Sequence, residues 1–151
     1  MLLLKEVDAE GFVFYTNYHS NKGQQINGNA KVAMLFYWPH LERQVRIEGS
    51  VVKVSRTESA DYFKIRPRGS QLGAWASQQS QVLKGRESLE KKYAEMEVRF
   101  KDQEVPVPDY WGGYRLLPVC IEFWQGRSNR LHDRLLYRKQ GKTWTIERLS
   151  P

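Results

Sequence analysis

Short apolar runs separated by turn-forming residues are the feature that most restricts how this chain can fold. The runs cover residues 12–17, 32–38, 43–54, 114–118, 120–124, 135–139 and 143–149. Such runs are typical of β-strands, and Gly, Pro and Asp between them are typical of turns. Their close spacing predicts a mainly β fold, an antiparallel β-barrel with peripheral helices, rather than a parallel α/β sheet.

Turn signals predict how some of these strands connect. The sequence DAEG at 8–11 separates residues 1–5 from residues 12–17, which predicts an N-terminal hairpin. Gly49 interrupts the longest alternating run and predicts a β-bulge there. The Gln140-Gly141 pair predicts a hairpin between the last two strands.

Two segments in the middle of the chain have helical periodicity instead. The first covers residues 57–66 and is ended by Pro67 and Gly69. The second covers residues 87–100 and carries an apolar stripe that we expect to pack on the core, formed by Leu89, Tyr93, Met96 and Phe100. Residues 104–113 form a proline-interrupted connector.

Length and charge favour a single domain with an anionic partner. The chain has 151 residues, with 24 Lys and Arg against 17 Asp and Glu, so its formal net charge is +7. Basic and acidic residues are interleaved, which argues against a nucleic-acid-binding tail. No run of 18 apolar residues exists, and Lys5 and Glu6 follow the apolar start. The sequence therefore predicts neither a membrane span nor a secretory signal, and we expect a cytoplasmic protein.

Several kinds of chemistry lack their motifs in this sequence. His19, His40 and His132 have no zinc-ligand spacing, and Cys120 is the only cysteine, so we expect no metal site and no internal disulfide. There is no G-x-G-x-x-G, P-loop or G-x-S-x-G motif. The two Gly-rich phosphate-binding devices and a serine hydrolase are therefore not supported.

Cationic side chains gather in residues 124–134. In an extended stretch Arg130, His132 and Arg134 share one face, because side chains alternate with a period of two. Such groups repel one another unless an anion lies between them. A solvated charged loop explains the same pattern equally well.

A second polar group surrounds Pro67. Tyr62 and Arg66 are i, i+4 neighbours on the predicted helix, and Ser70 can cap a following helix whose free N–H groups would face an anion. This is the outline of a phosphate cradle, and the alternative is a helix end with a surface arginine. A third polar group lies at 15–23, where an ordinary turn is the simpler interpretation.

A series of short motifs extends along almost the whole chain. They are LLLK at 2–5, FYTN at 14–17, SNKG at 20–23, LERQV at 41–45, YF at 62–63, RPRGSQLGAW at 66–75, QQS at 78–80, WGGYR at 111–115, EFWQG at 122–126 and RLHDR at 130–134. In this order they resemble the pyridoxamine 5′-phosphate oxidase family. The resemblance implies one FMN-binding split β-barrel domain over 1–151. It also implies a homodimer with flavin across the subunit interface, in which residues 110–151 form the dimerisation and active-site portion.

The resemblance also implies residue roles and a reaction. FMN would be surrounded by Lys5, Tyr15, Thr16, Lys22, Gln44, Gln79, Ser80, Trp124 and Arg134. The substrate would be contacted by Lys5, by Tyr62, Arg66 and Ser70 at its phosphate, and by the catalytic residues Arg130 and His132 at its pyridine ring. The implied reaction oxidises pyridoxamine or pyridoxine 5′-phosphate to pyridoxal 5′-phosphate, with oxygen as acceptor and hydrogen peroxide as product.

The sequence departs from the family pattern in two places. Met1 falls inside the family's R-x-V-L-L-K motif, which implies that its Arg and the preceding N-terminal segment are lacking, and Asn21 stands where the family has Arg. Losing two charge-assisted phosphate contacts would weaken FMN binding by roughly two to four decades. The alternatives are a phenazine-biosynthesis-type flavin oxidase, a non-catalytic barrel that binds flavin or pyridoxal phosphate, and a basic nucleic-acid-binding barrel.

Overall fold

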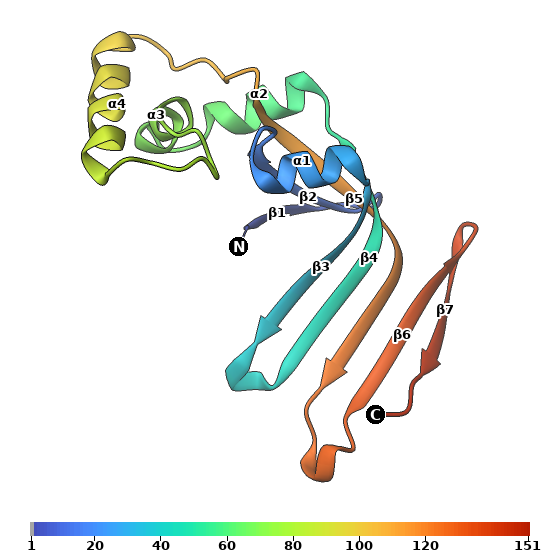
Figure 1. Cartoon of the computed structure of the whole chain (residues 1–151). Coiled ribbons are helices and arrows are strands. Elements are labelled where there is room, and N and C mark those ends of the chain that lie inside the picture. The colour runs from blue at the N-terminus through green and yellow to red at the C-terminus, as the bar shows by residue number, and fades with distance from the viewer. Residues whose placement is uncertain (1) are drawn as a thin grey trace.

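Among the residues that the structure describes, one antiparallel sheet of seven strands carries four α-helices at one of its ends (Figure 1). The structure is a computed structural model that describes residues 2–151. The strands are β1 (Leu4–Val7), β2 (Phe12–Asn17), β3 (Lys31–Trp38), β4 (Arg43–Lys53), β5 (Trp111–Gln125), β6 (Asp133–Gln140) and β7 (Thr143–Arg148). The helices are α1 (Asn21–Gly28), α2 (Arg56–Lys64), α3 (Arg68–Ala76) and α4 (Arg86–Arg99), with short 3₁₀ turns at Pro39–Leu41 and Ser128–Arg130.

Strand β5 connects the two ends of the sheet. Its first part, Trp111 to Leu116, pairs with β2, and its last part, Cys120 to Gln125, pairs with β6. On its other side β5 pairs with β4 over nearly its whole length, and the order is β1-β2-β5-β4-β3 with β7 beyond β6. Among the described residues β1 pairs only with β2 and β3 only with β4, so both have a free edge.

The bulge predicted at Gly49 is confirmed. The register with β5 jumps from Glu48 opposite Cys120 to Gly49 opposite Pro118, which leaves Val119 as the extra residue. A side chain at position 49 would lie 2.1 Å from the Leu117 carbonyl oxygen, so only glycine fits. A bulge tolerates a proline within a strand, because no regular ladder hydrogen bond is required there. The two strands predicted at 114–118 and 120–124 are therefore one continuous strand that passes through Pro118.

Both predicted hairpins and both predicted helices are present, α3 is the helix expected to follow Pro67, and helix α1 was not predicted. Helix α1 has only Gly23 and Ile26 buried, so it lacks the apolar stripe by which a helix is recognised in a sequence. Helix α3 begins directly after Pro67 and contains Gly69, which therefore does not end a helix as predicted. Among the described residues, no helix is both long enough and apolar enough to span a bilayer.

The protein has two apolar cores. The first lies inside the curved sheet and contains Phe14, Ile26, Met34, Ile47, Val51, Tyr114 and Leu116. The second lies among helices α2 to α4 and the start of β5, and contains Phe63, Leu72, Phe100, Val105 and Trp111. As predicted, Phe100, Tyr93 and Met96 of the α4 stripe pack on this second core, but Leu89, the first residue of the stripe, does not belong to it. The candidate site lies where the two cores meet.

Candidate functional site

A cavity of about 570 Å³ lies between β1, β2, the start of β5 and the turn that joins α2 to α3. We call it the cationic cavity, and its lining is Leu2, Leu3, Lys5, Tyr15, Thr16, Lys22, Tyr62, Ile65, Arg66, Pro67, Ser70, Gln79 and Trp111. Eight of these had been singled out from the sequence, namely Lys5, Tyr15, Thr16, Lys22, Tyr62, Arg66, Ser70 and Gln79. Three lining residues are basic and none is acidic, so the cavity suits an anion.

Local backbone features bring these side chains to the cavity. The register between β1 and β2 shifts between Leu4 and Glu6, so Lys5 is at an irregular position of the kind that redirects a side chain. Lys22 lies in the first turn of α1, whose N-cap Ser20 accepts a hydrogen bond from the Gly23 N–H. Gln79 accepts a hydrogen bond at 3.3 Å from the backbone N–H at the end of β2.

The turn at Pro67 differs from its predicted geometry. Helix α2 ends at Lys64, so Arg66 lies beyond it rather than on its surface. Ser70 is not the cap of α3, because Pro67 occupies that position and Ser70 lies in the first helical turn, where its N–H donates to the Pro67 carbonyl oxygen at 2.8 Å. The sharp change of direction at Pro67 nevertheless leaves Arg66 and Ser70 on the same cavity wall.

Three nearly parallel aromatic rings form one side of the cationic cavity. The ring centres of Tyr15 and Tyr62 are 4.0 Å apart, and those of Tyr15 and Trp111 are 5.4 Å apart with planes 9° from parallel. Burial, followed by the charges of Glu58 and Glu6, raises the pKa of Tyr15 to about 12. The sequence had given no role to Trp111, although its place before Gly112-Gly113 signals a close approach of chain segments.

Arg66 is a partly desolvated cation without a carboxylate partner. Its Nη1 atom is buried and has no hydrogen-bond partner among residues 2–151. Its guanidinium carbon lies over the rings of Trp111 and Phe63, at 4.7 Å and 5.3 Å from their centres. Burial lowers the pKa of Arg66. A buried donor left without a partner is costly, so this position favours binding of an anion.

A second group of the predicted residues lies at the opposite end of the sheet. Gln44, Trp124 and Arg134 are directly opposite one another on β4, β5 and β6, so they share one face, and we call them the strand row. Arg134 donates to Glu122 at 2.7 Å and to the Ser150 carbonyl oxygen at 3.0 Å. The hydrogen bond to Glu122 raises the pKa of Arg134.

The loop before β6 is not extended, so the predicted alternation of Arg130, His132 and Arg134 is wrong. Asn129 and Arg130 both have left-handed backbone conformations, with φ of 58° and 62°, and β6 begins only at Asp133. The loop is held by the Arg127 N–H, which donates to His132 Nδ1 at 3.2 Å. The His132 ring is 4.7 Å from the Trp124 ring, so His132 adjoins the strand row.

One chain does not bring all the predicted residues together. Trp111 and Trp124 lie near opposite ends of β5, which spans 15 residues and therefore a path on the order of 45 Å at about 3.3 Å per residue. None of the strand row, Arg130 or His132 lines the cationic cavity, and neither does the exposed Ser80 next to Gln79.

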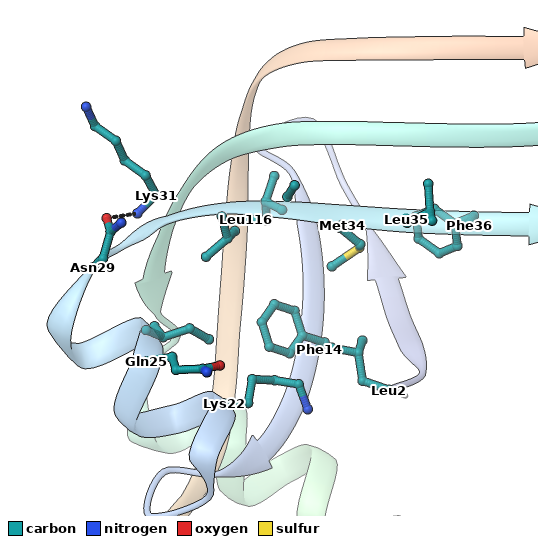
Figure 2. A pocket seen from close by; sticks show the side chains of 13 residues that line it. Leu2, Phe14, Lys22, Gln25, Asn29, Lys31, Met34, Leu35, Phe36 and Leu116 are labelled. Atoms are coloured by element: carbon teal, nitrogen blue, oxygen red, sulfur yellow. Dashed lines mark hydrogen bonds between the residues drawn. The ribbon is translucent and has the colours of Figure 1, made fainter.

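An apolar cavity of about 550 Å³ adjoins the cationic cavity and shares Leu2 and Lys22 with it. Figure 2 shows Phe14, Met34 and Leu116 around this space between β2, β3 and α1. Apart from Lys22, the only basic residue that lines it is Lys31. This cavity therefore lacks the cluster of cations that makes the cationic cavity suited to a phosphate.

Two family models together match nearly the whole chain. Residues 1–100 match the model described as "Pyridoxamine 5'-phosphate oxidase". Residues 111–151 match the one described as "Pyridoxine 5'-phosphate oxidase C-terminal dimerisation region".

Curated relatives named pyridoxine/pyridoxamine 5′-phosphate oxidase align with the full chain. The protein of Cyanothece sp. (strain PCC 7425 / ATCC 29141) is 58% identical over 151 residues, which is 100% of this chain and 71% of that protein. The protein of Pseudomonas fluorescens (strain SBW25) is 60% identical over 151 residues, which is 100% of this chain and 70% of that protein.

Solved structures share the fold. PhzG from Burkholderia lata 383, in complex with tetrahydrophenazine-1-carboxylic acid, has a TM-score of 0.91 and 31% identity over 99% of this chain and 73% of that chain. A pyridoxamine 5′-phosphate oxidase-related, FMN binding protein from Nostoc punctiforme PCC 73102 has a TM-score of 0.76 and 17% identity over 99% of this chain and 79% of that chain. The matching family models and the relatives at 58–60% identity confirm the resemblance found in the sequence, and the chain belongs to the pyridoxine/pyridoxamine 5′-phosphate oxidase family.

Proposed function

We propose that this protein is an FMN-dependent oxidase that converts pyridoxamine or pyridoxine 5′-phosphate to pyridoxal 5′-phosphate. Oxygen is the acceptor and is reduced to hydrogen peroxide, and the amine substrate also takes up water and releases ammonia. The names of the relatives support this reaction. The observation that carries it is the cationic cavity, where Lys5, Lys22 and Arg66 face a space without any acidic lining residue.

The residues present fit two organic phosphates, one of FMN and one of the substrate. Each phosphate carries roughly −1.5 to −2 charges at neutral pH, and the unpartnered Nη1 of Arg66 is a buried donor suited to such a group. When bound, FMN supplies the redox chemistry by accepting a hydride equivalent and passing the electrons to oxygen. The residues that would hold it are Lys5, Tyr15, Thr16, Lys22, Gln44, Gln79, Ser80, Trp124 and Arg134.

The substrate phosphate is held on the wall around Pro67. Tyr62, Arg66 and Ser70 supply a hydroxyl, a guanidinium and a second hydroxyl there, and Lys5 lies with its Nζ 5.8 Å from the centre of the Tyr62 ring. These groups bind and orient the substrate, and orientation against a reactive ring can lower a barrier by several kcal/mol.

Arg130 and His132 act on the pyridine ring of the substrate. Because His132 Nδ1 accepts the Arg127 N–H, the proton of the neutral imidazole is on Nε2, which leaves that N–H as a donor for a ligand. Arg130 supplies a cation from a backbone turn with two consecutive left-handed residues. Their role is to fix the ring angle and to stabilise negative charge, not to act as nucleophiles.

A complete site requires two copies of the chain. The cationic cavity and the strand row lie near opposite ends of β5, and a twofold pair of chains can place the cavity of one against the row of the other. We infer that residues 110–151 form the dimerisation and active-site portion, in agreement with the description of the family model that matches 111–151. Exposed Phe123 and Ile146 supply apolar surface for this contact.

The absorption spectrum of the freshly purified protein tests this function. We expect flavin bands, or their appearance when FMN is titrated into a colourless fraction, and hydrogen peroxide when pyridoxamine 5′-phosphate and oxygen are added. A protein that binds FMN but forms no peroxide would instead be a non-catalytic flavin-binding barrel. A protein without FMN binding would contradict the proposal altogether.

A phenazine-type oxidase is the second candidate, because PhzG from Burkholderia lata 383 is among the structural neighbours. The two candidates differ in whether the substrate carries a phosphate, and the presence of Tyr62, Arg66 and Ser70 in one cavity favours a phosphorylated substrate. Comparing turnover of pyridoxine 5′-phosphate with turnover of a phenazine precursor distinguishes the two.

A further inference from the structure

Trp111 is the one large aromatic residue of the cationic cavity without a role in the proposed function. It is the first residue of β5, and only 7% of its surface is exposed, yet its ring forms part of the cavity wall. It also belongs to the second apolar core, which lies among the helices, together with Phe63 and Phe100. Trp111 therefore connects a rigid part of the protein to the place where the phosphate is bound.

The Arg66 guanidinium is held mainly by aromatic faces. Its carbon lies 4.7 Å from the Trp111 ring centre and 5.3 Å from that of Phe63, and among residues 2–151 no carboxylate lies within ion-pair distance. Trp is the best of the aromatic rings for a cation–π contact, and such a contact uses none of the N–H donors of the guanidinium. The Trp111 face therefore orients the donors of Arg66 without using them.

The Trp111 ring itself is fixed from several sides. The backbone of Trp111 is anchored by two hydrogen bonds: its main-chain N–H donates to the Pro108 carbonyl oxygen at 3.0 Å, and its main-chain carbonyl oxygen accepts from Arg56 Nη1 at 2.9 Å. The Trp111 and Phe63 rings pack edge to face, with their centres 5.0 Å apart and their planes at 70°. The Tyr15 and Tyr62 rings are nearly parallel to it, so the same platform also aligns the Tyr62 ring.

We propose that Trp111 is a positioning residue for phosphate recognition, which holds the Arg66 guanidinium so that its free N–H groups face the phosphate of the B6 ester. The inference rests on the proposed function and assigns its phosphate specificity to a residue that need not touch the phosphate. It follows that loss of the indole face weakens binding of the phosphorylated ligand through Arg66, and leaves the contacts to the pyridine ring intact.

Equilibrium dialysis with the FMN-loaded protein tests this inference, with pyridoxal 5′-phosphate and pyridoxal as the two ligands. We expect Trp111→Leu to raise the dissociation constant of pyridoxal 5′-phosphate about tenfold and Trp111→Phe about threefold, in the order of cation–π strength. The dissociation constant of pyridoxal should change by less than about twofold. In the Arg66→Gln background, Trp111→Leu should add less than about twofold, because the partner of the indole is gone.

Trp75→Phe is the matched control. Trp75 packs on the same second core, and its ring centre lies 5.0 Å from the Arg99 guanidinium carbon, but it does not line the cationic cavity. This variant should keep the wild-type affinity for pyridoxal 5′-phosphate even if its stability falls. If the Trp111→Leu protein does not fold, the more conservative Trp111→Phe variant still tests the inference.

The outcomes separate this inference from the proposed function. Equal losses for both ligands, or an undiminished effect of Trp111→Leu without Arg66, would overturn the positioning role while the oxidase proposal stands. The positioning role would also be overturned if the wild-type protein oxidises its substrate but both Trp111 variants bind pyridoxal 5′-phosphate with wild-type affinity. Failure of the wild-type protein to bind pyridoxal 5′-phosphate would overturn the proposed function, and this inference with it.

Discussion

Two arginines from the predicted site have opposite surroundings. Arg134 is already bonded to Glu122 at 2.7 Å, and this hydrogen bond raises its pKa. Arg66 has a buried Nη1 without a partner among residues 2–151, and burial lowers its pKa. A guanidinium that is paired with a carboxylate stabilises the sheet in addition to any contact with a ligand. A guanidinium without a partner is available to an anion.

We expect Arg130→Ala and Arg134→Ala to impair the protein in different ways. Arg130 is exposed, and the proposed function places its cation at the substrate ring, so its loss should lower kcat/KM about 100-fold or more with FMN content near the wild-type level. Loss of Arg134 frees Glu122 and should mainly reduce FMN content. The flavin-to-protein absorbance ratio and kcat/KM at saturating FMN measure the two effects. Equal loss of FMN in both variants would contradict this division of roles.

Tyr15 should make the stability sensitive to alkaline pH. Burial, then the charges of Glu58 and Glu6, raises the pKa of Tyr15 from 10.0 to about 12. In the unfolded chain the phenol ionises at its ordinary pKa, so its stabilisation is fully present below pH 10 and is lost as the pH rises toward 12. The urea midpoint should fall over this range, and less steeply in Tyr15→Phe. Identical slopes in the two proteins would refute the assignment.

At the scale of elements, the start of β5 is packed too closely for any residue but glycine. A side chain at Gly113 would lie 2.6 Å from Val54 Cγ2 and 2.8 Å from Tyr15 Cε1. Gly113→Ala should therefore lower the free energy of unfolding by about 1–3 kcal/mol. Displacement of the Tyr15 ring should also weaken FMN binding. Urea unfolding and FMN titration measure these two effects.

Gly28→Ala is the control for this substitution. Gly28 is the last residue of α1, and a side chain there meets nothing within 4 Å. The change should leave FMN binding unaltered and raise the free energy of unfolding by about 0.4–1 kcal/mol, because it restricts the unfolded chain. If both alanines weaken FMN binding alike, the contact of Gly113 with Tyr15 is not the cause.

The elements that could be predicted from the sequence are those whose periodicity reflects burial. Strand β4 and helix α4 pack one side on a core, so their apolar residues recur at regular spacing, and β3 is recognised by an unbroken apolar run. Helix α1 buries only two residues, and α3 begins directly after the proline that ends the preceding segment, so neither has such a signal. The turn at 128–132 depends on left-handed backbone that no side-chain pattern specifies.

For the whole molecule, the sequence predicted many of the residues that line the cationic cavity, but not how they are arranged. The motifs identified Lys5 and, some sixty residues further along the chain, Tyr62 and Arg66, and all three line one cavity. The position of Trp111 under Arg66 depends on the packing of β5 against α2, and the pairing of Arg134 with Glu122 depends on strand register. Neither contact follows from residue type alone. The separation of the cavity from the strand row likewise follows from the length of β5.

Because the proposed site is shared between two chains, inactive variants should be able to complement each other. Arg66→Ala damages the cationic cavity and Arg130→Ala damages the loop beside the strand row, so each homodimer has two defective sites. A mixed dimer has one site with both defects and one with neither. Random reassociation of equal amounts makes half of the dimers mixed, so about a quarter of the wild-type activity should return. Mixing Arg66→Ala with Tyr62→Ala, both in the cavity, should restore none. No recovery in the first mixture would mean that each site is built within one chain.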